Sequence, residues 1–149
     1  MISVISIGTD RQVFQEGSAV RERLLKQRAF FKELHVIVFA RRAAGFRAEQ
    51  LGNLWLYPTN SLHKLLYVRG AAELGRGIAQ VRGMTAQNAV VTAQDPFECG
   101  LSGLRVARKS GLPLQVAFRS LRTKPVTFAP VFWISEMALI MESRFVEPA

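Results

Sequence analysis

The fold is indicated by the stretch VVTAQDPFECGLSGLRVARKSG, residues 90–111, which predicts a buried strand followed directly by a helix. Val90 and Val91 form a short β-branched run bounded by polar residues, as is typical of a strand buried on both faces of a parallel sheet. Asp95 is a favourable N-cap for the helix, and Gly111 is a favourable residue to end it. Polar turns between a strand and a helix commonly carry the functional residues of an α/β protein.

The helix predicted after Pro96 carries apolar residues along one side, at a spacing close to that of an α-helix. We expect this side to face the sheet. It comprises Phe97, Leu101, Leu104 and Val106. Cys99 lies in the first turn with no histidine nearby in the sequence, so a small packed residue is favoured over a nucleophile.

The rest of the chain continues this alternation of strands and helices. Further strands are predicted over residues 2–7, 34–39, 54–57 and 114–118. Helices are predicted over residues 18–32 and 61–82, with a basic loop or short helix over 41–51. Strands that alternate with helices imply parallel pairing through right-handed crossovers. The expected fold class is therefore α/β, a doubly wound parallel sheet of about five strands with helices on both faces.

The two long helices have recognisable starts. Ser18 is the expected cap of the first, in which Val20 and Leu24 face the core and Arg21 lies mostly away from it. Asn60 or Ser61 is the expected cap of the second. Three glycines in the second helix, at positions 70, 75 and 77, weaken its predicted continuity.

The composition limits the class of protein. The chain has 149 residues, 49% of them hydrophobic, which suits one ordinary domain. The single cysteine excludes an internal disulfide and makes a reducing cytoplasm the simplest compartment. The first residues lack the basic region of a signal peptide, and the longest weakly charged stretch, 126–141, is too short to span a bilayer. We expect a cytoplasmic protein, soluble or peripheral to the inner face of the membrane.

The chain is strongly basic, with a formal net charge of +9. Its basic residues are spread over several predicted helices and loops, and no nucleic-acid-binding motif accompanies them. An anionic lipid surface or a phosphorylated ligand therefore fits at least as well as nucleic acid. A merely solvated basic surface is the simpler alternative.

Ligands of an open parallel sheet bind beyond the carboxyl ends of its strands. The loop after the first strand has glycines only at positions 8 and 17, so both the dinucleotide fingerprint and the P-loop are absent. Gly17 and Ser18 either bind an anion through backbone N–H groups at the helix start or form an ordinary cap. Asp95 and Glu98 are two carboxylates at another helix start, where capping is favoured over a general-base role for Asp95.

The two histidines carry no recognisable catalytic arrangement. His35 opens a predicted buried strand, so we expect a structural residue. His63 lies at the start of a predicted helix, where an exposed or capping role is favoured. No nucleophile, base and orienting group show the spacing of a catalytic triad.

Four segments, in this order and spacing, resemble the N-terminal domain of family 4 glycosyltransferases. They are DRQVFQEGSAVRER (10–23), ELHVIVFARR (33–42), LYPTNS (56–61) and VVTAQDPFECGLSG (90–103). The resemblance covers residues 1–118, which it identifies as a Rossmann-like N-terminal domain. Residues 119–149 form a divergent tail in which residues 132–146 are able to form one helix.

The resemblance implies a two-domain enzyme of GT-B architecture. Such enzymes transfer a sugar, with retention of configuration, from a nucleotide-sugar to a glycan or lipid-linked acceptor, usually without a bound metal, and we expect no cofactor. Carried onto this chain, the loop with Gly17 and Ser18 lies near the donor phosphates. Gln94, Asp95 and Glu98 line the acceptor side of the cleft. Thr59 and Asn60 lie on its rim.

Two departures from the family pattern bear on activity. Family members often carry a His-Thr-Asp element where this chain has Arg119, Ser120 and Leu121, so the expected histidine is missing and no catalytic residue is assigned. The donor-binding second domain is also absent. We therefore expect this chain to be inactive alone, as a truncated or frame-disrupted enzyme or as a short protein that uses the donor domain of another chain.

The sequence leaves two other function classes open. The first is a non-enzymatic basic module that binds anionic lipid or nucleic acid. The second is a flavodoxin-like regulatory domain, which the first loop disfavours because it lacks a phosphate-binding pattern.

Overall fold

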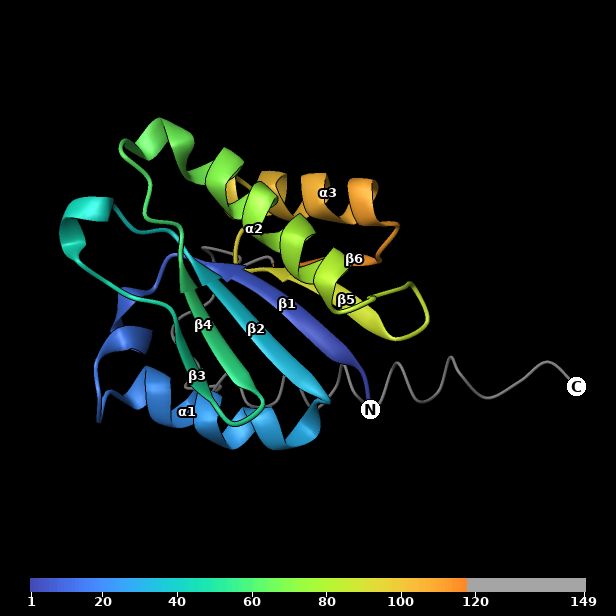
Figure 1. Cartoon of the computed structure of the whole chain (residues 1–149), viewed down its shortest axis with the longest axis horizontal. Helices are drawn as coiled ribbons and strands as arrows, with labels where there is room; N and C mark the ends of the chain where they lie inside the picture. Colours follow the sequence, from blue (N-terminus) through green and yellow to red (C-terminus); the bar gives the residue numbers. More distant parts are fainter. Residues whose placement is uncertain (118–149) are drawn as a thin grey trace, which may run out of the picture. The chain divides into compact units, whose positions relative to one another are not determined.

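The computed structural model describes residues 1–117 (Figure 1). These residues form a Rossmann-like α/β fold with a six-stranded sheet in the order β3-β4-β2-β1-β5-β6. The strands are β1 (Ser3–Gly8), β2 (Glu33–Val38), β3 (Glu49–Leu51), β4 (Leu54–Pro58), β5 (Ala89–Ala93) and β6 (Leu114–Val116). The α-helices are α1 (Ala19–Gln27), α2 (Tyr67–Val81) and α3 (Glu98–Ser110). The predicted α/β class and its mainly parallel sheet are confirmed.

Four short 3₁₀ helices complete the described elements. They are η1 (Arg11–Phe14), η2 (Arg28–Phe30), η3 (Arg42–Ala44) and η4 (Lys64–Leu66). η1 and η4 precede α1 and α2 in the chain, whereas η2 continues from the end of α1. Three of these turns, η1, η3 and η4, lie in loops that follow the carboxyl ends of strands.

β3 is the one element of the sheet that was not predicted as a strand. It pairs antiparallel with β4, and Gln50 lies opposite Trp55. The two strands are joined by a tight turn in which Gly52 has a φ of 65°, a value that favours glycine. β3 has only three residues and none of them is buried, so no hydrophobic alternation marks it in the sequence.

The helices lie on both faces of the sheet, as predicted. Figure 1 shows α1 on one face and α2 and α3 on the other. The main core lies between the sheet and the pair α2 and α3, where Ile5 is in register with Val91, and Ile7 is in register with Ile37. All four of these side chains are fully buried. The crossovers place every helix start at the carboxyl edge of the sheet.

α1 begins as predicted but buries a residue expected to be exposed. The Ser18 hydroxyl caps the helix by accepting a hydrogen bond from the Arg21 N–H at 3.2 Å. The helix ends at Gln27, several residues earlier than predicted, and continues as η2. Arg21 is only 6% exposed and its guanidinium pairs with the Glu49 carboxylate at 2.8 Å. The expectation that Arg21 lies away from the core was wrong because its partner stands on the unpredicted strand β3.

α2 starts later than predicted, at Tyr67 rather than after Asn60 or Ser61. Asn60 has a φ of 47°, which is left-handed backbone and cannot belong to the helix. The Ser61 N–H donates to the carbonyl of Ala40 at 3.0 Å, which ties this segment to the chain that follows β2. The three glycines were expected to weaken the continuity of this helix, but it runs through all of them without a break.

The apolar side predicted for α3 is partly wrong. Phe97 is 77% exposed and Leu101 is 44% exposed. The buried side is made of small residues instead, namely Cys99, Gly100, Ser102, Gly103, Val106 and Ala107. A Cβ atom on Gly103 would lie 2.9 Å from the Leu114 side chain, so the helix approaches the sheet too closely for large side chains on this face.

The ends of α3 follow the predicted chemistry with a small shift. The Asp95 carboxylate accepts the N–H of Phe97 at 2.8 Å, and the helix itself begins three residues after Asp95, at Glu98. Gly111 ends the helix with a φ of 67°, as predicted. The predicted Arg119-Ser120-Leu121 departure and the helix at 132–146 lie outside the described residues. Within residues 1–117, no helix is both long enough and apolar enough to cross a bilayer.

Candidate functional site

The sheet contains a topological switch point between β1 and β5. From β1 the chain crosses first to β2 on one side, and after β4 it crosses back to β5 on the other side. The loops that follow β1 and β5 therefore diverge, and in open parallel sheets a ligand-binding crevice is expected between such loops, at the carboxyl edge of the sheet. We call this position the crevice. Gly8 ends β1 and Gln94 directly follows β5, so these two residues would form the floor of the crevice.

Gln94 is held over Gly8 by specific contacts. Its side-chain carbonyl accepts the N–H of Thr9 at 3.0 Å, and its own N–H donates to the carbonyl of Ile7 at 3.0 Å. A Cβ atom on Gly8 would overlap the side-chain amide of Gln94, so this arrangement requires glycine at position 8. Gln94 is exposed, which leaves its amide open to a ligand in the crevice.

Asp95 and Glu98 continue the wall of the crevice on the β5 side. Asp95 is partly buried and Glu98 is exposed in the first turn of α3, where the helix dipole favours a carboxylate. Burial raises the pKa of the Cys99 thiol well above its usual range, and the neighbouring Asp95 carboxylate raises it further. Cys99 is thus a protonated, fully buried packing residue, as predicted, and not a nucleophile.

The loop after β1 is folded on itself by polar contacts. The Ser18 hydroxyl donates to the carbonyl of Gln12 at 2.6 Å in addition to capping α1, so it is used within the loop. Gly17 is exposed and has a φ of 74°. An anion bound near Gly17 and Ser18 would therefore rely on backbone N–H groups.

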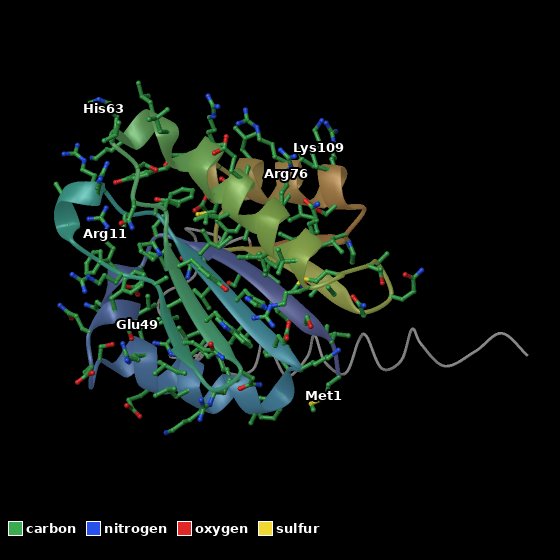
Figure 2. The ribbon with its side chains drawn as sticks, in the orientation of Figure 1. Met1, Arg11, Glu49, His63, Arg76 and Lys109 are labelled. Atoms are coloured by element: carbon green, nitrogen blue, oxygen red, sulfur yellow. The ribbon has the colours of Figure 1, made fainter. Side chains whose placement is uncertain are left out.

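Arg11 brings a cation to the same edge of the sheet. Its Nε donates to the carbonyl of Phe39 at 3.2 Å, which places the guanidinium beside the carboxyl ends of β1 and β2 (Figure 2). A guanidinium has further N–H donors that remain available for an anionic ligand. Arg11 is thus a basic side chain held at the edge of the sheet that carries the crevice.

Thr59 and Asn60 lie apart from the crevice. The Thr59 hydroxyl accepts the N–H of Ala40 at 3.0 Å and donates to its carbonyl at 3.1 Å, which locks the end of β4 to the chain after β2. Three strand spacings separate β4 from β5, so Thr59 is roughly 14 Å from Gln94. Asn60 is exposed beyond this lock. The predicted site residues therefore share one edge of the sheet but do not form one cluster.

A groove lies between α2 and β4, away from the crevice. This groove has a volume of about 610 Å³. Its lining comprises Tyr57, Thr59, Gly70, Glu73, Leu74, Gly77, Ile78, Val81 and Arg82. The sequence did not indicate this groove, because it arises from the gap between the glycine-containing side of α2 and the edge of the sheet.

One side of the groove adjoins a polar cluster built around His35. The His35 ring is fully buried and stacks on Trp55, with 4.6 Å between the ring centroids. One ring nitrogen lies 3.2 Å from the Glu33 carboxylate and the other lies 3.3 Å from the Tyr57 hydroxyl. Arg82 covers the Trp55 ring at 4.7 Å from its centroid and pairs with Glu33 at 3.4 Å. His35 is thus structural, as predicted, and these contacts explain its burial.

Protonation of His35 should make the protein less stable at mildly acidic pH. Burial lowers the pKa of His35 in the folded chain, whereas the unfolded chain titrates near 6.5. The unfolded chain therefore binds more protons, and the stability that neutral His35 contributes is present above pH 6.5 and lost as the pH falls below it. We expect His35→Gln to flatten the fall in unfolding free energy, measured in urea from about pH 7 to about pH 5.5.

The exposed residue His63 supplies the control for this measurement. His63→Gln makes the same substitution at this exposed position and should change the free energy of unfolding near pH 7 by no more than about 0.5 kcal/mol. A His35→Gln variant with the same pH dependence as the unchanged protein would contradict the account of His35.

Comparisons with known proteins do not identify a family for this chain. No family model matches the chain, and no curated protein matches it. The function is therefore inferred from the fold, from the residues of the crevice and from the four sequence segments described above.

Proposed function

We propose that residues 1–118 form the acceptor-side domain of a retaining glycosyltransferase of GT-B architecture. The observation that carries the proposal is the position of Gln94, whose amide lies over Gly8 at the topological switch point of the sheet. The ordered set of four sequence segments that resemble family 4 glycosyltransferases supports it. Each of these four segments has polar residues shortly after the end of a strand, at the carboxyl edge that carries the crevice.

The residues of the crevice suit recognition of a sugar acceptor. An amide side chain such as that of Gln94 both donates and accepts hydrogen bonds, which matches the hydroxyl groups of a sugar. Asp95 and Glu98 add carboxylate acceptors on the same wall, and Asp95 is oriented by its bond to the N–H of Phe97. In the proposal these three residues bind and orient the acceptor. Thr59 and Asn60 lie apart from the crevice and would contact only a larger acceptor that extends along the edge of the sheet.

The donor side of the reaction is assigned to other groups. Gly17 and Arg11 lie in the loop after β1, where backbone N–H groups and a guanidinium suit the phosphates of a nucleotide-sugar. The rest of the donor would be held by a second domain facing this edge. The proposed substrates are thus a nucleotide-sugar donor and a glycan or lipid-linked acceptor, with no cofactor.

The need for a second domain is tested by a transfer assay. The 149-residue chain is incubated with UDP-glucose or GDP-mannose and with alkyl glycosides as acceptors, and products are separated by chromatography. We expect no transfer from either donor. Formation of a glycosylated product by the chain alone would refute the assignment of donor binding to another domain.

A further inference from the structure

The loop before α2 presents leucines to solvent at the carboxyl edge of the sheet. Leu62 is 64% exposed, Leu65 is 94% exposed and Leu66 is 39% exposed. Leu65 and Leu66 belong to the short turn η4, and Leu62 comes just before it. We call these three residues the leucine tip. Figure 2 shows the neighbouring residue His63 at the outer end of the domain, beside the start of α2. Leucines this exposed and this close together are uncommon on a surface that meets only water.

Basic side chains flank the leucine tip. The segment of residues 40–66 carries four basic residues, at 41, 42, 47 and 64, and one acidic residue, Glu49. Glu49 is paired with the buried Arg21, so its charge is offset within the fold. Backbone contacts hold Arg41 and Arg42 beside the leucine tip. The Arg42 N–H donates to the carbonyl of Ser61 at 3.1 Å, and Arg41 forms an isolated β-bridge with Ser61.

We propose that the leucine tip and its flanking basic residues dock this domain on an anionic lipid bilayer. An interfacial site combines apolar side chains that enter the boundary of the acyl chains with basic side chains that attract anionic headgroups. The leucine tip supplies the first, and Arg41, Arg42 and Lys64 supply the second. The positive charge favours a bilayer over an apolar protein groove as the occupant, because the leucines and the cations share one surface.

Docking through the leucine tip would bring the acceptor crevice close to the bilayer. The leucine tip and the crevice at Gly8 and Gln94 lie at the same edge of the sheet, since both follow the carboxyl ends of strands. A bilayer that contacts the tip would therefore face the crevice. This inference rests on the proposed function and specifies its acceptor as one carried on a membrane lipid.

The proposal is tested by flotation of the full chain with lipid vesicles. One set of vesicles is pure phosphatidylcholine and the other contains phosphatidylglycerol as well. We expect binding to the anionic vesicles. The double variants Leu62→Ser/Leu65→Ser and Arg41→Gln/Arg42→Gln should each weaken this binding by on the order of tenfold or more.

Two control variants make the same chemical changes elsewhere on the surface. Val81→Ser removes an apolar side chain that is 83% exposed at the opposite end of α2. Arg76→Gln/Lys109→Gln removes two charges from the outer sides of α2 and α3, away from His63 (Figure 2). Both controls should bind anionic vesicles as the unchanged protein does. Equal losses in the controls and in the tip variants would overturn the proposal, because they would indicate a diffuse effect of charge.

Two further outcomes would also overturn it. The first is no binding to either kind of vesicle. The second is tighter binding to a mixed-sequence oligonucleotide that the leucine variants do not weaken, which would assign the basic residues to nucleic acid. Neither outcome depends on a donor domain or on a sugar, so the vesicle assay can fail while the proposed acceptor site stands.

Discussion

Replacement of Phe39 by alanine should lower the free energy of unfolding by about 3 to 5 kcal/mol. Phe39 is 2% exposed and is the largest of the fully buried side chains. Its ring stacks on Tyr67 with 5.2 Å between the centroids, and Tyr67 is the first residue of α2. Removal of the ring would leave a cavity beneath the start of this helix. The measurement is equilibrium unfolding in urea, followed by circular dichroism.

The same substitution at Phe30 is the matched control. Phe30 is 54% exposed, so Phe30→Ala should change the free energy of unfolding by no more than about 0.5 kcal/mol. Equal effects of the two substitutions would contradict the packing of α2 on the end of β2. That packing also matters for the site, since Phe39 bonds through its backbone to both Gly8 and Arg11.

Because α2 packs closely on α3, replacement of glycine by alanine should have opposite effects at Gly75 and at Gly77. A Cβ atom on Gly75 would lie 2.6 Å from a methyl group of Val106, which is fully buried. Val106 is β-branched and has one favoured rotamer in a helix, so it cannot turn aside. Gly75→Ala should therefore destabilise the protein by about 1 to 3 kcal/mol, even though alanine favours the helix. Gly77 has open space around it, and Gly77→Ala should stabilise the protein by about 1 kcal/mol.

A second-site variant isolates the contact. Val106→Ala removes the methyl groups that a Cβ atom on Gly75 would meet. In that background, Gly75→Ala should no longer destabilise the protein, and its effect should approach that of Gly77→Ala. Thermal or urea unfolding of the four proteins measures this coupling. If Gly75→Ala is equally harmful in both backgrounds, the helices do not cross as the structure has them.

The strands that form the parallel sheet could be predicted because their residues are β-branched or apolar and are bounded by turns. β1, β2 and β5 are buried on both faces, and this burial produces the continuous apolar runs seen in the sequence. β3 could not be predicted, because three partly exposed residues leave no pattern. The error at Arg21 followed from it, since the burial of that side chain depends on Glu49 of β3.

The helix surfaces were harder to predict than the strands. Spacing alone indicated that Phe97 and Leu101 face the sheet, but the close approach of α3 at Gly103 excludes large side chains there. A pattern of small residues, including Cys99 and Gly100, was the available signal for this close packing. The late start of α2 depends on Ser61 bonding to Ala40, a contact between loops that no local pattern encodes.

For the candidate site, the location could be predicted from the sequence, but the arrangement of its side chains could not. Its location follows from topology, because any parallel sheet of this order has its crevice after β1 and β5. The placement of Gln94 over Gly8 could not be predicted, since it depends on a side-chain rotamer and on a contact across 85 positions of sequence. The exposure of Leu62 and Leu65 could not be predicted either, because both leucines would be buried in the helix that the sequence predicts.

If the crevice between β1 and β5 binds a sugar acceptor, binding should change the amide chemical shifts of the residues that form it. The full chain is titrated with methyl glycosides of glucose, mannose and N-acetylglucosamine and, separately, with UDP-glucose. We predict that at least one methyl glycoside shifts the amides of Thr9, Gln94 and Asp95 saturably. Gly8→Ala, which displaces the Gln94 amide, should abolish these shifts while the fold is retained. Shifts confined to the groove at Gly77 and Ile78, or no saturable shift with any glycoside, would contradict acceptor binding in the crevice.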